Sequence, residues 1–251
     1  MIRFLRRFDP HSIRLLVFDL DGTLIDSRLD LIHSINATLR HFGRPELPGD
    51  VIASYVGDGA PALVQRALGN GADEAFFKQA LEYFLAYYRM HKLDHTAVYD
   101  GIPEVLAALA GSCGADTPVD SPSQSSGSLR AGSVRPGQQR LMAVLSNKPV
   151  HPSRAIVEAL GMGDYFVRVY GGNSFPTKKP DPLGVRTLLE ETSVTPQEAL
   201  MIGDSSIDVQ TGQNAGMWTC GVLYGFAPHS LEEVRPDVLV ERPAELGELF
   251  G

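Results

Sequence analysis

Residues 15–23 read LLVFDLDGT, a run of four apolar side chains that ends in a turn with two aspartates. A short continuous apolar run bounded by turn residues is typical of a strand buried on both faces of a parallel sheet. The turn carries Asp19 and Asp21. Taken alone, this turn is a weak indication of a functional site, because aspartate is common in turns and helix caps.

Similar apolar runs recur along the chain and alternate with amphipathic segments. The other predicted strands are 141–145, 166–170, 200–202, 218–223 and 237–240. Helical segments between them include 152–160, 182–191 and 208–215. This alternation predicts an α/β fold, a doubly wound and mainly parallel sheet of the Rossmann-like kind.

Two stretches interrupt the alternation. From residue 27 to 96 no convincing strand occurs, and the periodicity predicts helices over 29–42, 60–68 and 75–90. We therefore expect a small all-helical cap domain over 26–96, inserted after the first strand, and an α/β core made of 1–25 and 97–251. The second stretch is 111–139, where Ser, Gly and Pro make up 15 of 29 residues. Its composition predicts a flexible loop within the core.

The overall composition excludes several classes of protein. The chain has 251 residues, of which 43% are hydrophobic and 21% charged, as in an ordinary globular protein. Its net charge of −8 leaves no basic surplus for a phosphate backbone, so we expect no nucleic-acid partner. No apolar run suits a membrane span, and the basic residues 1–8 lack the core of a signal peptide. Those residues are expected to form a mobile extension or a packed first turn.

Cysteine usage points to a reducing compartment. Cys113 and Cys220 are too few for a disulfide framework and lack the paired spacing of a zinc site. The sequence therefore predicts a cytoplasmic protein, and its oligomeric state stays open.

Four polar clusters are each interpreted as lying just after a predicted strand. Because the carboxyl ends of parallel strands share one edge of a sheet, the clusters are expected to meet in one crevice. They would bring together four carboxylates, one hydroxyl and one ammonium: Asp19, Asp21, Asp204, Asp208, Ser146 and Lys179. Four crowded carboxylates repel one another unless a hard cation joins them, and a phosphate substrate favours Mg²⁺.

In this order the clusters resemble the four signature motifs of the haloacid dehalogenase superfamily of phosphatases. The resemblance covers nearly the whole chain outside 111–139 and the N-terminal tail. It implies a nucleophilic Asp19, an acid/base Asp21 and phosphate contacts from Ser146 and Lys179, with which we group Asn147. It further implies a Mg²⁺ site formed by Asp19, Asp204 and the backbone carbonyl of Asp21. Asp208 would be a further ligand or lie just behind the ligands.

A narrower resemblance concerns the substrate. Residues 56–68, VGDGAPALVQRAL, are similar to the VGxGxxxLxxRAL stretch of phosphoglycolate phosphatases, and residues 146–149, SNKP, are similar to their TNKP. Gly57 and Gly59 would then offer backbone amides to a small carboxylate, or they simply form a turn against the core. Arg66 is interpreted as a solvated helix residue rather than a carboxylate partner.

The predicted activity is therefore Mg²⁺-dependent hydrolysis of a small phosphomonoester, with 2-phosphoglycolate as the leading substrate, through an aspartyl phosphate. The alternatives are a phosphatase of another small organic phosphate or of pyrophosphate, a sugar phosphomutase, and a regulatory protein with an inactive site.

Two further patterns in the helical stretch are interpreted as packing. His91 and His95 have a zinc-compatible spacing but no third ligand beside them. The aromatic group Tyr83, Phe84, Tyr87 and Tyr88 is expected to pack inside the cap, with ligand stacking as the minor alternative.

Overall fold

The computed structural model describes residues 1–111 and 140–251. Apart from Gly111, the predicted loop at 111–139 lies outside the described residues.

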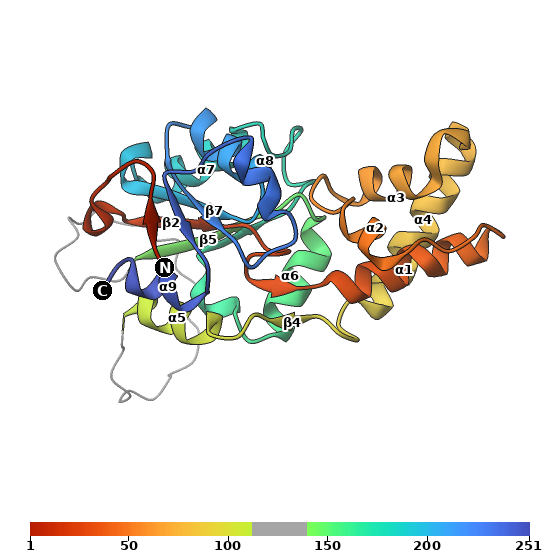
Figure 1. The fold of residues 1–251 in the computed structure, drawn as a ribbon, viewed down its shortest axis with the longest axis horizontal. Helices are drawn as coiled ribbons and strands as arrows, with labels where there is room; N and C mark the ends of the chain where they lie inside the picture. The colour runs from red at the N-terminus through yellow and green to blue at the C-terminus, as the bar shows by residue number, and fades with distance from the viewer. Residues whose placement is uncertain (112–139) are drawn as a thin grey trace, which may run out of the picture.

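A seven-stranded sheet with the order β1-β9-β8-β7-β2-β5-β6 forms the centre of the larger part of the molecule (Figure 1). All its strand pairs are parallel except the pair of β1 and β9. This arrangement confirms the predicted α/β fold with a doubly wound sheet. The strands are β1 Arg3–Phe4, β2 Leu15–Phe18, β5 Leu141–Leu145, β6 Arg168–Tyr170, β7 Ala199–Gly203, β8 Trp218–Val222 and β9 Val238–Val240.

Successive residues of the inner strands are buried against opposite layers of helices, which explains their unbroken apolar runs. From β2, Leu16 and Phe18 belong to one hydrophobic cluster with α5, α6 and α9, whereas Leu15 and Val17 pack toward α7. Figure 1 shows α7 and α8 above the sheet and α5 and α9 below it. The bounds are α5 Ile102–Ala110, α6 Val150–Ala159, α7 Leu183–Thr192, α8 Ser206–Asn214 and α9 Ala244–Glu248.

The N-terminal segment differs from the sequence expectation. Instead of a mobile extension or a packed turn, it contributes β1 as an antiparallel edge strand beside β9. Arg6 holds it there through an ion pair with Asp237 and a contact over the Trp218 ring, 4.3 Å from the centroid. A strand of two residues is too short to leave a periodic pattern in the sequence.

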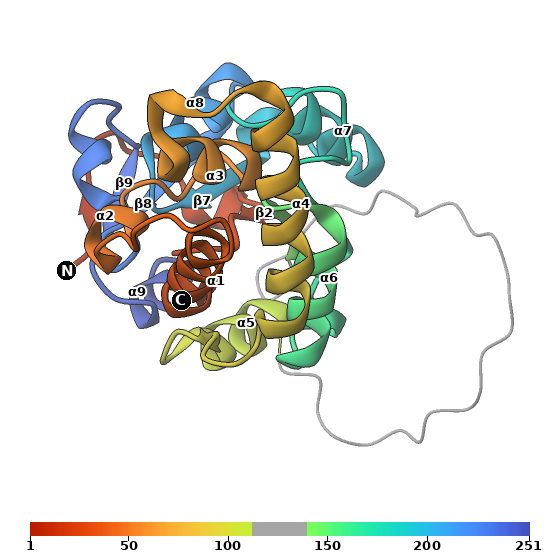
Figure 2. The same ribbon diagram turned by 90° about the vertical axis from the view of Figure 1, so that its right-hand side faces the viewer.

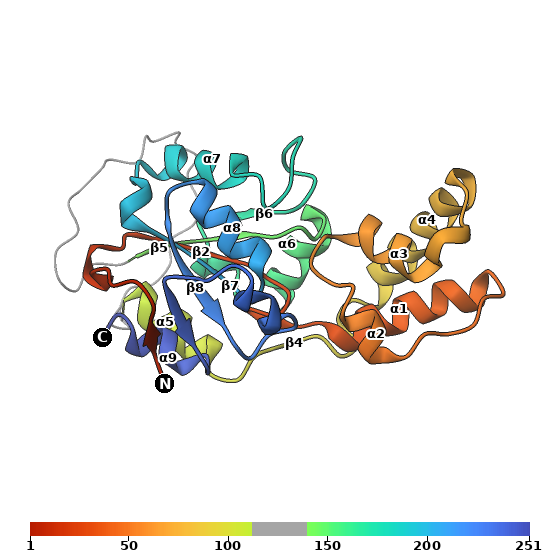
Figure 3. The same cartoon turned by 45° about the horizontal axis from the view of Figure 1, so that its top comes forward.

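The remaining helices form a bundle with a hydrophobic cluster of its own, beyond the carboxyl ends of the strands (Figures 2 and 3). Ile35, Ile52 and Phe84 are almost fully buried in this cluster. The helices are α1 Arg28–His41, α2 Gly49–Ala53, α3 Ala60–Leu68 and α4 Glu74–His91. We call α1 to α4 the helical unit.

The chain enters and leaves the helical unit through two adjacent short strands. β3 Ile25–Asp26 and β4 Ala97–Val98 pair antiparallel and form a separate two-stranded sheet. Of the predicted cap bounds, 26 is the last residue of β3 and 96 directly precedes β4. Among the described helices, none is long and apolar enough to cross a membrane.

Candidate active site

The central strands bring three of the predicted polar clusters together around one lysine. Asp19 directly follows β2, and its backbone N–H donates to the carbonyl of Ile202 in β7. The Lys179 ammonium donates to Oδ1 of Asp19 and to Oδ1 of Asp208, both at 2.6 Å. Lys179 lies in the loop before α7, and Asp208 lies in the first turn of α8.

Asp208 is held in place by the start of α8. Its Oδ2 accepts hydrogen bonds from the backbone N–H and the hydroxyl of Ser205, the residue that caps the helix. Both carboxylate oxygens of Asp208 are therefore engaged, one by the helix cap and one by Lys179.

The carboxylate of Asp204 is held by two backbone N–H donors. Its Oδ2 accepts the N–H groups of Phe226 and Ala227, at 2.5 and 3.2 Å. Gly22, with φ +85°, passes so close that a Cβ there would collide with the same carboxylate. The DLDGT turn thus needs glycine both for its backbone conformation and for the approach of Asp204.

Burial and mutual repulsion raise the pKa values of two of the carboxylates. Burial, opposed by Lys179 and assisted by Asp208, raises the pKa of Asp19 to about 6. Burial, then Asp208 and Asp19, raise the pKa of Asp204 to about 8. Burial acts in the opposite sense on Lys179, but Asp19 and Asp208 raise its pKa nonetheless, so the lysine stays charged.

These residues fit a hard divalent cation. Carboxylate oxygens of Asp19, Asp204 and Asp208 lie within 4.8 Å of one another, and all three residues are buried. We call these three residues the acidic cluster. When ionised, they carry three negative charges against the single positive charge of Lys179. Oxygen-only ligands with excess negative charge suit Mg²⁺ or a similar ion rather than a soft metal.

Asp21 has partners that the sequence analysis missed. The Lys148 ammonium donates to both oxygens of Asp21, at 2.7 and 3.0 Å, and the Ser27 hydroxyl donates to Oδ1 at 2.5 Å. Lys148 is the lysine of the SNKP stretch and is 6% exposed. Its position two residues after Ser146, just past the end of β5, is the signal from which a place in the same crevice could have been predicted.

Asn147 joins the core to the helical unit. Its side-chain amide donates to the carbonyls of Gly57 and Lys179, both at 3.1 Å. Gly57 therefore presents its carbonyl to the core, and Gly59 passes so close to the Asn147 carbonyl that a Cβ would lie 2.7 Å from it. These contacts favour the interpretation of the two glycines as a turn against the core. A role of Asn147, Gly57 or Gly59 in binding substrate stays a prediction.

A cavity of about 740 Å³, including its open mouth, lies between the core and the helical unit. Its core side contains the acidic cluster with Ser146 and Lys179, and its other side is mainly apolar. The helical unit contributes chiefly Leu31, Val56, Leu63, Phe84, Leu85 and Tyr88. Arg66 is not among the lining residues, because it binds Asp58 and the carbonyl of Tyr55 on the exposed side.

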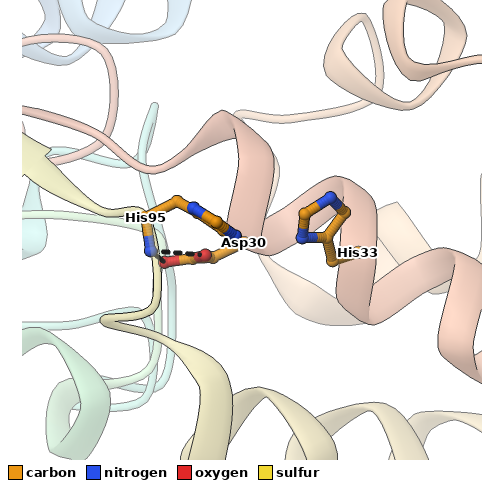
Figure 4. Close-up of side chains that lie close together, drawn as sticks. All are labelled: Asp30, His33 and His95. Carbon is orange, nitrogen blue, oxygen red and sulfur yellow. Dashed lines mark hydrogen bonds between the residues drawn. The ribbon is translucent and has the colours of Figure 1, made fainter.

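The histidines of the helical unit contact neighbouring side chains. His91 pairs with Asp94 at 2.7 Å and stacks on Tyr87, whereas His95 faces His33 with ring centroids 5.1 Å apart. Figure 4 shows Asp30 beside His95, with His33 on the adjacent turn of α1. Ligand atoms of Asp30, His33 and His95 lie within 4.8 Å of one another.

However, the Asp30 carboxylate already accepts the backbone N–H groups of His95 and Thr96 and the Thr96 hydroxyl. Asp30 therefore holds the start of α1 to the chain that leaves the helical unit.

Comparison with known proteins agrees with this geometry. A family model described as haloacid dehalogenase-like hydrolase matches residues 13–216, which include every residue of the acidic cluster. The chain belongs to this family. Haloacid dehalogenase-like hydrolases similar to it include phosphoglycolate phosphatases from Pseudomonas putida and Chromobacterium violaceum. The first is 35% identical over 85% of this chain and 70% of its own length, and the second 34% identical over 95% and 96%.

A solved structure agrees with these sequence matches. The crystal structure of a predicted phosphoglycolate phosphatase from Haemophilus somnus covers 96% of this chain and 99% of its own, with 27% identity and a TM-score of 0.81. The haloacid dehalogenase-like family and these relatives identify the chain as a phosphoric monoester hydrolase, as the sequence motifs predicted.

Proposed function

We propose that the chain hydrolyses 2-phosphoglycolate to glycolate and phosphate, with Mg²⁺ as cofactor and with a phosphoryl group carried transiently on Asp19. The observation that carries the proposal is the pairing of Asp19 with Lys179 at the floor of a cavity that also contains Asp21. The names of the relatives support the choice of substrate.

The first step needs a nucleophile and a positive charge next to each other. An oxygen of Asp19 attacks phosphorus, and the bond between phosphorus and the ester oxygen breaks. Asp21, two residues later, gives a proton to the departing oxygen. Lys179 Nζ, 2.6 Å from Asp19 Oδ1, stabilises the negative charge on the transferred phosphoryl group. Ser146 donates its hydroxyl to the same group.

The second step returns the enzyme to its starting state. A water molecule attacks phosphorus, Asp21 takes its proton, and the bond between phosphorus and Asp19 breaks to release inorganic phosphate. Asp19 and Asp204 would hold the cation through carboxylate oxygens, and Asp208 would position Lys179. When bound, Mg²⁺ supplies charge neutralisation for the phosphate oxygens.

The helical unit would act as the cap that recognises the rest of the substrate. The carboxylates with the metal, and Lys179 with Ser146, meet only the phosphoryl group, so discrimination between phosphomonoesters must come from groups that meet the leaving half. The apolar side of the cavity comes mainly from this unit.

The test is a phosphate-release assay over a panel of small phosphomonoesters, with Mg²⁺ and with EDTA. We expect Mg²⁺-dependent release that is fastest with 2-phosphoglycolate. Fast turnover of a different ester would replace the substrate but keep the reaction, and formation of an isomer in place of free phosphate would indicate a sugar phosphomutase. No turnover of any panel member would refute the proposal.

A further inference from the structure

The cavity contains a second positive charge apart from the one at the phosphoryl end. Among the described residues that line it, the positively charged side chains are Lys148 and Lys179. Lys179 is bound between Asp19 and Asp208, deep in the core. Lys148 lies instead between Asp21 and the helical unit, with its Nζ 4.7 Å from the centroid of the Tyr88 ring.

Tyr88 brings a hydroxyl to the same place. It is 4% exposed and lines the cavity, and among the described residues its hydroxyl makes no hydrogen bond of ordinary geometry, although Lys148 lies close enough to lower its pKa against the effect of burial. A buried hydroxyl without a partner is costly, so a ligand that accepts a hydrogen bond from it gains affinity. Burial raises the pKa of this hydroxyl to about 12, which keeps it a donor at neutral pH.

We propose that Lys148 and Tyr88 together bind the carboxylate of the substrate, so that this enzyme selects small phosphomonoesters that carry a carboxylate close to the ester oxygen. The proposal rests on the proposed function and names the residues that choose its substrate.

The position of Lys148 limits how far the carboxylate of the substrate can lie from the ester oxygen. Asp21 must reach the ester oxygen to protonate it, and Lys148 Nζ lies 2.7 Å from an Asp21 oxygen. A carboxylate bound by Lys148 is therefore near the ester oxygen, as in a molecule with a single carbon between the carboxylate and that oxygen. Two donors of this kind, one of them charged, match the two oxygens of a carboxylate.

The same residue could instead serve only to position Asp21, and a comparison of two substrates separates these roles. The probes are 2-phosphoglycolate and 2-hydroxyethyl phosphate, which is similar in size but has no carboxylate. A group that only positions Asp21 affects both substrates equally, whereas a group that binds the carboxylate affects mainly the first.

The main variant is Tyr88→Phe, which removes one hydroxyl and keeps the ring beside Lys148. We expect its loss of kcat/KM on 2-phosphoglycolate to exceed its loss on 2-hydroxyethyl phosphate by about tenfold or more. Tyr87→Phe, one residue earlier on α4 and outside the cavity lining, is the matched control and should leave both values unchanged. Lys148→Met should lower kcat/KM for both substrates, and the loss should be larger for 2-phosphoglycolate. Lys148→Arg should restore part of the preference for 2-phosphoglycolate over 2-hydroxyethyl phosphate.

A binding measurement makes the test independent of turnover. We titrate 2-phosphoglycolate calorimetrically into the Asp19→Asn protein with Mg²⁺. Its Kd should be at least about tenfold lower than the Kd of the Asp19→Asn, Tyr88→Phe double variant. Equal losses on the two substrates, or an unchanged Kd, would overturn the carboxylate site while leaving the phosphatase activity intact. Absence of all turnover would refute the proposed function, and the titration would still decide the carboxylate site.

Discussion

Lys179 is shared by two carboxylates, and only one of them has a free oxygen for chemistry. Both carboxylate oxygens of Asp208 accept hydrogen bonds, whereas among the described residues the carboxylate of Asp19 accepts one side-chain hydrogen bond, from Lys179 to Oδ1. This difference assigns the nucleophile to Asp19 and a positioning role to Asp208.

The first prediction concerns the nucleophile. Asp19→Asn should lower kcat by about a thousandfold or more, because an amide is a poor nucleophile and a weaker metal ligand. The fold should persist, since the change removes one of several crowded buried charges. Phosphate release and a thermal melt check the two statements, with the exposed Asp164→Asn as control. Retention of more than about a tenth of the rate would remove Asp19 from this role.

The second prediction concerns pH in metal-free buffer. Asp19 and Asp204 have pKa values of about 6 and about 8 in the folded protein, against 3.8 ordinarily. Between pH 4 and 8 the folded state therefore holds protons that the unfolded state has released. Raising the pH in this window destabilises the folded state.

We accordingly expect Tm in EDTA to fall between pH 5 and pH 8, and Mg²⁺ to raise Tm more at pH 8, where the carboxylates are ionised. Asp204→Asn, which removes the group with the higher pKa, should flatten the decline in EDTA. A Tm that rises from pH 5 to pH 8 in EDTA would contradict the assigned shifts.

At this scale the sequence predicted the acidic cluster but not the environment of Asp21. Asp19, Lys179 and Asp208 follow from motif order and strand ends, which are local features. Lys148 was missed because a lysine in a turn is usually solvent-exposed, and only the packing of Tyr88 and Asp21 around it shows that it is buried.

Among the elements, the turn that enters α3 has the most constrained contact with the core. Gly59 has φ +87° and lies against the Asn147 carbonyl. We predict that Gly59→Ala lowers kcat/KM for 2-phosphoglycolate about tenfold or more, because the strained turn can no longer close on the core. Acetyl phosphate, which makes fewer demands on cap closure, should lose less. Equal losses would show that the turn serves folding or general closure.

The start of α1 is predicted to depend on Asp30. Asp30→Ala leaves the N–H groups of His95 and Thr96 without their acceptor. We expect the free energy of unfolding to fall by about 1–3 kcal/mol, measured by urea denaturation. His33→Ala, at the exposed neighbour of His95, should cost much less. A loss as large in His33→Ala would indicate that ring packing rather than the carboxylate joins the two segments.

The long elements were predictable and the short ones were not. Helix α3 matches its predicted range of 60–68, and α1 and α4 differ by one residue at either end. The strands β1, β3 and β4 have two residues each, and α2 has five, so none is long enough to show a hydrophobic pattern that repeats. These elements form through contacts between residues far apart in the sequence.

For the whole molecule, the last prediction concerns the segment 111–139. The backbone N–H of Arg140 lies 3.4 Å from the carbonyl of Leu109, so the two flanks already meet. Replacing residues 111–139 by a short turn should preserve Tm and phosphate release, because the segment has little apolar surface to bury. Aggregation or loss of activity in the shortened protein would show that the segment has a structural or functional role.

The pairing of β3 with β4 has a consequence for how such a molecule can diversify. The chain crosses between the core and the helical unit at two strands that lie side by side. A different insert whose two ends lie side by side could therefore replace the helical unit without a change in the strand order of the seven-stranded sheet. Exchange of this insert between homologous enzymes would therefore transfer a preference for one ester over another while the hydrolytic machinery stays constant.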